Sequence, residues 1–268
     1  MTTVDETSEG RRNLIFPPFQ AHPAYTKKIS SYSIIEDGIK NLRSYRLFRD
    51  NTARINHMDF SHDGKLLITS SDDDSMIVYD SDKATKLQTV NSKKYGSCLI
   101  QFASDNKSVL HGSSKVDHTI RYLSIDNKQY IRYFAEHKNR VRSLSMSPVD
   151  ECFLSCSLDN TMKLWDLRAT NSQANMKNNS PAVAAFDRDG MVFGVALASK
   201  DLKLFDIRNI DKGPFSSITL PAECTGEVSN IQFSPNNRLV AIGTRSDEFY
   251  LVDTFEPKFP AQIERTPE

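Results

Sequence analysis

Short apolar runs separated by polar turns set the pattern of this chain. The sharpest example is SLDNTMKLWD, Ser157 to Asp166, which contains the only tryptophan. Asp and Asn side chains hydrogen-bond the local backbone, so Asp159 and Asn160 predict a tight turn. The run Met162 to Trp165 that follows the turn predicts a β-strand.

This turn-and-strand pattern occurs five times. Its copies end at residues 80, 124, 166, 206 and 253, which gives spacings of 44, 42, 40 and 47 residues. A second mark, a bulky apolar residue before a polar turn, recurs with almost the same spacing at Phe60, Phe102, Met146, Phe186 and Phe233. Two marks that agree on a period of about 40 to 45 residues are typical of the blades of a WD-type β-propeller.

The period predicts an all-β propeller of five blades, each with four antiparallel strands, a to d. In the first blade we expect strands near residues 55–60, 66–70, 76–79 and 86–90. Strand d of the third blade falls in the polar run 171–179, which favours an irregular edge. The expected blades span about 53–92, 93–136, 137–180, 181–222 and 223–253, within a propeller domain of residues 34–253.

Two segments lie outside the repeats. Residues 1–33 are polar, acidic and rich in proline, and are expected to form a disordered leader; residues 254–268 are expected to be a C-terminal tail. The leader contains an apolar motif, Leu14 to Phe19, which is either part of a loosely packed linker or a segment that docks into a groove. Leu42 to Phe48 has the composition of a strand and is the expected closure strand of the last blade.

Composition excludes several classes of protein. With 38% hydrophobic and 25% charged residues the chain is an ordinary globular one, and Lys+Arg equals Asp+Glu at 34, which gives no global signal for nucleic acid or an acidic membrane. No stretch approaches the roughly 18 apolar residues of a membrane span. The four cysteines are expected to be reduced thiols in the cytosol or nucleus, because the N-terminus lacks a secretory signal.

Seven motifs, taken in order, resemble the small WD-repeat subunit of COMPASS-type SET-domain histone methyltransferase complexes, which is shared with phosphatase and 3′-end-processing assemblies. They are SSDDDS (Ser70 to Ser75), NSKKYG (Asn91 to Gly96), DHTIRYLS (Asp117 to Ser124), YIRYF (Tyr130 to Phe134), LSMSPVD (Leu144 to Asp150), LWDLR (Leu164 to Arg168) and DKGPF (Asp211 to Phe215).

The resemblance implies a nuclear, non-catalytic adaptor that links transcribing RNA polymerase II to chromatin methylation and termination. The implied partners are a SET-domain methyltransferase subunit, the phosphorylated polymerase tail, and phosphatase-targeting or termination factors. Neither membrane binding nor direct sequence-specific binding of nucleic acid is expected. A truncated isoform that competes for the same partners, or a subunit of a phosphatase or 3′-end-processing complex, is the alternative.

The family that the chain resembles has seven blades, whereas five are recognisable in this sequence. An open arc that exposes apolar faces at both ends is therefore expected. The alternative is a compact five-blade ring closed by Leu42 to Phe48.

One group of residues invites a catalytic interpretation. His137, a serine of strand b (Ser155 or Ser157), Asp159 and Trp165 match the hydrogen-bonded tetrad of WD blades, although His, Asp and Ser also form hydrolase triads. No GxSxG elbow is present and the same positions recur in degenerate form in other blades, so we expect a structural role and no enzyme activity.

No metal or cofactor is expected. Cys152 and Cys156 are about 13 Å apart on one strand face at about 3.3 Å per residue, too far to ligate one ion without a turn. The run Asp72 to Asp74 looks like a carboxylate cluster, but Asp73 aligns with the turn residue Asp159. Asp187 to Gly190 resembles a calcium loop without its bidentate Glu, and there is no Gly-rich phosphate loop.

Basic and aromatic residues mark the candidate binding surface. The connections that enter blades two and three carry Lys93, Lys94, Tyr95, Lys138, Arg140 and Arg142. For Arg142 the alternative is a side chain that points along strand a of blade three. Because Arg binds phosphate through two hydrogen bonds, this rim is a candidate for a phosphorylated peptide, and a solvated rim balanced by nearby aspartates is the alternative. Arg121, Tyr122, Arg132 and Tyr133 also alternate basic and aromatic residues, but packing between blades is favoured over base stacking.

Overall fold

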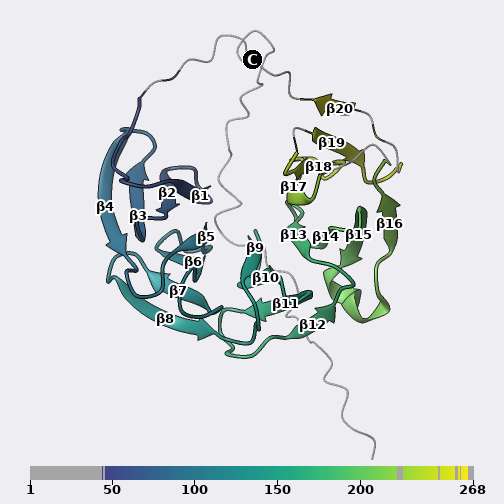
Figure 1. Cartoon of the computed structure of the whole chain (residues 1–268), viewed down its shortest axis with the longest axis horizontal. Helices are drawn as coiled ribbons and strands as arrows, with labels where there is room; N and C mark the ends of the chain where they lie inside the picture. The colour runs from purple at the N-terminus through teal and green to yellow at the C-terminus, as the bar shows by residue number, and fades with distance from the viewer. Residues whose placement is uncertain are drawn as a thin grey trace, which may run out of the picture. The chain divides into compact units, whose positions relative to one another are not determined.

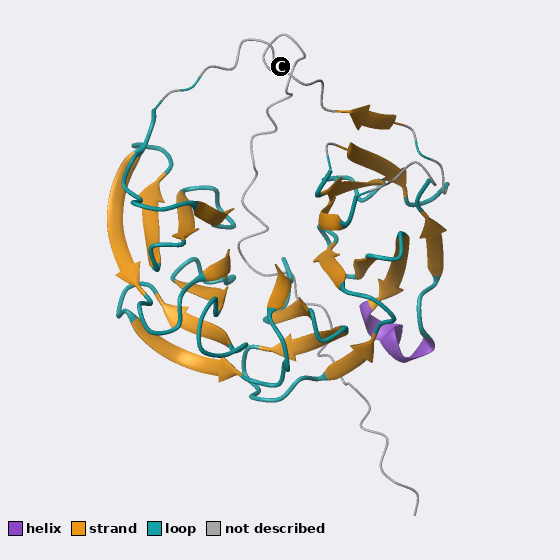
Figure 2. Cartoon of the chain, viewed as in Figure 1, coloured by secondary structure: helices purple, strands orange, loops and turns teal. Residues whose placement is uncertain are grey.

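Strands make up nearly all the regular structure of the described residues. The computed structural model describes residues 44, 46–221, 226–246, 248–256, 259 and 261–264, all within the second of the two units into which the chain divides, 43–268. The expected leader, including the motif Leu14 to Phe19, lies outside the described residues. Twenty strands and one 3₁₀ helix are described, and Figure 2 shows how strands dominate.

The strands form five four-stranded antiparallel sheets, each built from consecutive strands. Figure 1 shows the first strand of each sheet on the inner side and the fourth on the outer side. Blade one contains β1 (Ile55–Phe60), β2 (Leu66–Ser71), β3 (Ser75–Asp80) and β4 (Thr85–Asn91); blade two contains β5 (Cys98–Phe102), β6 (Ser108–Gly112), β7 (Ile120–Ser124) and β8 (Gln129–Phe134).

Blade three contains β9 (Val141–Met146), β10 (Cys152–Ser157), β11 (Thr161–Asp166) and β12 (Ala174–Lys177). Blade four contains β13 (Ala182–Phe186), β14 (Val192–Leu197), β15 (Asp201–Asp206), the 3₁₀ helix η2 (Ile207–Lys212) and β16 (Ser216–Thr219), and blade five contains β17 (Val228–Phe233), β18 (Leu239–Thr244), β19 (Glu248–Asp253) and β20 (Ala261–Glu264).

The predicted five blades of four strands are thus confirmed, with three differences. The polar run in blade three still forms β12, but this strand is only four residues long. Blade five continues past the expected boundary at Asp253, because β20 pairs with β19. The predicted closure strand is wrong for its described residues, 44 and 46–48, which belong to no strand; the Phe48 ring instead packs on Tyr79, with ring centroids 4.6 Å apart.

Apolar side chains fill four cores, one at each junction between consecutive blades. Strand b is buried on both faces in blades two and three, where all five residues of β6 and all six residues of β10 are buried. Trp165 and Phe153 lie in the core between blades two and three, where their rings stack with centroids 5.9 Å apart. Cys152 and Cys156 lie on the opposite face, in the core shared with blade four. No blade can therefore bury its apolar surface without a neighbour.

Polar side chains join the inner strands at the first three junctions. In each case the acceptor is the side chain of the residue that precedes the bulky apolar residue of the repeat. The donor is the backbone N–H of the corresponding bulky residue in the next blade. Asp59 Oδ2 accepts from Phe102 N at 2.8 Å, Gln101 Oε1 from Met146 N at 2.8 Å, and Ser145 Oγ from Phe186 N at 3.0 Å. We call these three contacts the junction bonds.

The fourth junction is built differently. Its residue before the repeat mark is Ala185, which has no side-chain acceptor. Close packing replaces the junction bond: a Cβ on Gly194 would lie 3.3 Å from the Phe233 ring. Arg142 of blade three reaches blade five, where it pairs with Glu227 and donates from Nη2 to Val228 O at 2.8 Å.

The junction bonds predict a specific loss of stability. Gln101→Met keeps the side-chain volume but removes the acceptor of the Met146 N–H, which then lies unpaired in the junction. We expect a loss of about 1–3 kcal/mol in the free energy of unfolding, measured by urea denaturation. The matched control is Gln232→Met, because Gln232 occupies the same repeat position in blade five and is exposed. Equal losses in both variants would contradict a stabilising role of the hydrogen bond from Met146 N to Gln101.

Candidate functional site

The antiparallel order of each blade places its connections on two rims. We call the rim that carries the b-to-c turns and the d-to-a connections the upper rim. The lower rim carries the a-to-b turns and the c-to-d connections. Of the basic and aromatic residues singled out in the sequence, Lys93, Lys94, Tyr95, Lys138 and Arg140 lie on d-to-a connections and so belong to the upper rim, whereas Arg142 is the second residue of β9.

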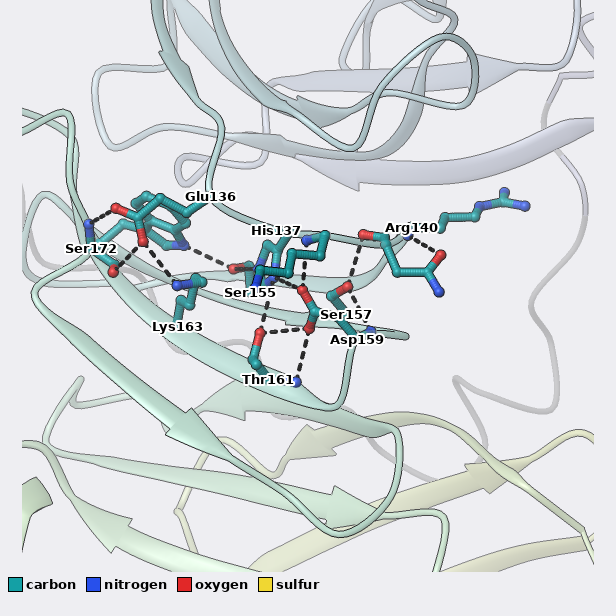
Figure 3. A network of polar contacts seen from close by, with 12 residues as sticks. Glu136, His137, Arg140, Ser155, Ser157, Asp159, Thr161, Lys163 and Ser172 are labelled. Carbon is teal, nitrogen blue, oxygen red and sulfur yellow. Dashed lines mark hydrogen bonds and ion pairs between the residues drawn. The ribbon is translucent and has the colours of Figure 1, made fainter.

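A buried polar network joins the upper rim to the core of blade three (Figure 3). Trp165 Nε1 donates to Ser155 Oγ at 2.8 Å, and Ser155 Oγ lies 2.7 Å from His137 Nε2. His137 Nδ1 lies 3.1 Å from Asp159 Oδ2. These distances are consistent with a chain in which the Ser155 hydroxyl donates to Nε2 and the Nδ1 proton points to Asp159.

Ser155 is thus the serine that joins the tetrad. The alternative, Ser157, bonds elsewhere: its Oγ donates to Asn139 O at 2.8 Å and accepts from Asp159 N at 3.1 Å. It fixes the b-to-c turn rather than the histidine.

The electrostatics of the network favour a neutral imidazole. Burial lowers the pKa of His137 and the hydrogen bond to Asp159 raises it. The effect of burial is the larger, so the pKa lies below its usual value. Burial opposes ionisation of Asp159, but hydrogen bonds from Thr161 and the Lys138 N–H outweigh it and lower its pKa to about 2. Ser155 is fully buried, so its Oγ is closed to a substrate.

An ion pair extends the network and was missed from the sequence. Lys163 Nζ lies 2.8 Å from Glu136 Oε2, although the Lys163 side chain is only 7% exposed. Glu136 also accepts from the backbone N–H and hydroxyl of Ser172. Burial opposes the ionisation of Glu136, yet the contacts with Lys163 and Ser172 lower its pKa to about 2. The only available signal was a lysine inside the apolar run of β11.

The connection that enters blade two presents Lys93 and Lys94 to solvent. Tyr95 lies between them and the core, with its ring 3.6 Å from the guanidinium carbon of Arg121. Arg121 is buried and pairs with Asp117 at 2.6 Å. Arg121 therefore has a packing role, as the sequence favoured over base stacking.

The backbone of this connection is also fixed. Tyr95 O accepts from the N–H groups of Ser114 and Lys115, at 3.1 and 2.9 Å. Gly96 has a φ of 72°, and a Cβ at this position would collide with Ser114 Oγ. The glycine thus lets the connection lie against the b-to-c loop of its own blade.

The connection that enters blade three presents Lys138 and Arg140, which are both exposed. Arg142 is different, because only 9% of its side chain is exposed and its guanidinium pairs with Glu227. That pairing, helped by Arg245, lowers the pKa of Glu227. The structure therefore exposes Lys93, Lys94, Lys138 and Arg140 on the upper rim, with Tyr95 half-buried, and turns Arg142 toward blade five.

Other candidate chemistry resolves into turns and buried thiols. Asp73 accepts hydrogen bonds from Ser75 and Thr52, as a turn cap does. The described residues contain no group of three or more His, Cys, Asp or Glu placed to hold a metal ion. Cys98, Cys152 and Cys156 are free and buried, and burial raises the pKa of each thiol to about 11 or 12. Among the described helices, none is long and apolar enough to cross a bilayer.

The fold and the tetrad define a WD-repeat β-propeller. The model of the WD domain, G-beta repeat matches residues 42–80 and 128–166. The chain is 42% identical to WD repeat-containing protein 82 of Drosophila melanogaster, over 83% of this chain and 70% of that protein. It belongs to the family of that protein, which confirms the resemblance found in the sequence.

Two fungal relatives carry names that refer to a complex. Set1 complex component swd2 of Schizosaccharomyces pombe is 34% identical, over 85% of this chain and 65% of the relative. COMPASS component SWD2 of Saccharomyces cerevisiae is 29% identical, over 81% of this chain and 66% of the relative. The chain thus spans about two thirds of the length of these relatives.

The tetrad predicts a loss of stability when Ser155 is replaced. In Ser155→Ala the Trp165 N–H loses its acceptor and His137 Nε2 loses its hydroxyl partner, both in a buried site. At about 1–3 kcal/mol for each of the two unpaired groups, we expect a loss of about 2–6 kcal/mol in the free energy of unfolding, measured by urea denaturation. Ser217→Ala, on the exposed face of β16, is the control and should change it by less than about 0.5 kcal/mol. A Ser155→Ala protein as stable as the wild type would contradict the network.

Proposed function

We propose that the chain is a non-catalytic scaffold subunit of a nuclear Set1/COMPASS-type histone lysine methyltransferase complex, which it links to transcribing RNA polymerase II and to transcription termination. Membership of the family of WD repeat-containing protein 82 is the observation that carries this proposal. The names of the two fungal relatives, a Set1 complex component and a COMPASS component, support the choice of complex.

A scaffold role also agrees with the chemistry of the described residues. The His, Ser and Asp groups that resemble a triad are held in a buried network, and Ser155 accepts a hydrogen bond from the Trp165 indole. The exposed basic residues singled out on the upper rim, Lys93, Lys94, Lys138 and Arg140, lie on the connections that enter blades two and three. Such a surface is suited to binding a charged partner segment rather than to moving a proton.

We assign contact with the polymerase tail to the upper rim. Lys93, Lys94, Lys138 and Arg140 are exposed cations on the d-to-a connections of two adjacent blades. Lys115, on the same rim, is already paired with Asp74 at 2.5 Å, so it is left out of the binding set. Four exposed cations suit a peptide that carries phosphoserine.

The complex is tested by affinity purification. The tagged chain is expressed in cells of the organism from which it comes and is purified from nuclear extract. Mass spectrometry should then show a SET-domain methyltransferase subunit enriched over a tag-only control. Recovery of phosphatase or 3′-end-processing subunits without a methyltransferase would overturn the assignment in favour of the other complexes. Absence of the chain from the nuclear fraction would contradict the localisation.

The upper rim is tested with a polymerase tail peptide phosphorylated on serine. Replacement of Lys93, Lys94, Lys138 and Arg140 with Ala should weaken binding at least about tenfold in fluorescence polarisation, because four charge-assisted contacts are lost.

Four exposed lower-rim cations, replaced together with Ala, provide the matched control: Lys65, Lys107, Lys128 and Arg188. This variant should bind like the wild type. Equal weakening in both variants would mean that only net charge matters, and unchanged affinity in the upper-rim variant would exclude the surface.

A further inference from the structure

Blade four carries a groove on its lower rim that the proposed function does not use. The groove has a volume of about 510 Å³ and lies between the a-to-b turn near Met191 and the connection from η2 to β16. The only described helix, η2, forms one wall and is purple in Figure 2. The sequence motif DKGPF, Asp211 to Phe215, supplies part of the lining.

The connection that forms the groove is held rigidly. Ile207 and Ile210 anchor η2, because both are buried in the core between blades three and four. Gly213 ends the helix with a φ of 82°, a conformation that favours glycine, and its N–H donates to Ile210 O. Pro214 then restricts the backbone, and Phe215 N donates to Leu204 O at 2.9 Å. The Phe215 side chain is thus presented from a fixed backbone.

Two large apolar side chains in this lining are exposed. Phe215 is 61% exposed and Met191 is 45% exposed. Neither belongs to one of the four junction cores. A rigid backbone that holds a phenyl ring and a flexible thioether in one groove offers a preformed site for an apolar side chain.

The charges of the lining favour an acidic occupant. Arg208 and Lys212 are exposed, and the only acidic residue in the lining is Asp206. The Asp206 carboxylate is already engaged: it accepts from Asn209 Nδ2 and from the Arg208 N–H, each at 2.9 Å, and these contacts lower its pKa. Arg208 Nη2 lies 3.8 Å from Met191 Sδ, a weak contact that a carboxylate of a ligand can replace.

We propose that this groove binds a linear peptide segment of a partner protein, with an apolar side chain between Met191 and Phe215 and acidic residues beside Arg208 and Lys212. RNA is a weaker fit. Two cations neutralise few phosphates, and the Asp206 carboxylate lines the same groove. The groove lies on the rim opposite to the phosphopeptide surface, so this inference goes beyond the proposed function and does not depend on it.

Selection from a phage-displayed library of random nine-residue peptides tests the occupant. On the wild-type chain we expect enriched peptides with a large apolar residue within three positions of Asp or Glu. Phe215→Ser should weaken their binding about tenfold or more, since a buried aromatic anchor carries much of the affinity of such contacts. Phe255→Ser is the matched control, because Phe255 is also exposed, at 77%, but lies in blade five, and it should leave binding unchanged.

A charge-reversed variant keeps the proposal falsifiable if Phe215→Ser folds poorly. Arg208→Glu with Lys212→Glu should lose the acidic peptides and select basic ones instead, with the thermal midpoint within a few degrees of the wild type. The proposal is overturned if no peptide is enriched, if the enriched peptides bind all variants equally, or if a single-stranded RNA oligonucleotide competes for the groove more strongly than the acidic peptides.

Discussion

The contact between consecutive inner strands is the constraint on which this fold depends. Each blade is apolar on both faces, so a single blade cannot fold without a neighbour that covers it. Packing alone sets the distance between blades but not their register. The junction bonds from Asp59, Gln101 and Ser145 supply that register, because each pairs one side chain with one backbone N–H of the next blade. The cost is visible at Asp59, where burial raises the pKa of the carboxyl to about 6.

The repeat was readable from the sequence because turns and strand ends use few residue types. The positive φ values of Asp74, Asn160 and Lys200 fall at the same point of three b-to-c turns, and two of these residues are of the types that tolerate such a backbone. The junction bonds were not readable, since an aspartate, a glutamine and a serine share no pattern. All three residues stand directly before the bulky apolar residue of their repeat. Their role as acceptors becomes visible only when the backbone register of the blades is known.

The candidate site was predictable in part, for a similar reason. The four tetrad residues could be named, but the choice between Ser155 and Ser157 depends on which strand face meets Trp165. The basic rim could be named as well, but composition could not separate the exposed Arg140 from Arg142. Both lie close together in sequence, and the difference comes from strand alternation and from a glutamate 85 positions further along the chain.

Arg142 also shows how stability and binding compete for the same groups. Arg142 belongs to the inner strand β9 of blade three, and it pairs with Glu227 of blade five, two blades further along the chain. A guanidinium held in this way is no longer available to a phosphate, since a ligand would first have to displace a carboxylate and the Val228 carbonyl. The cations left for a partner are those on connections fixed by their own blade: Lys93 and Lys94 beside the Tyr95 backbone bonds, and Lys138 beside the Asp159 cap. The cations open to partners are therefore those that no contact between blades already uses.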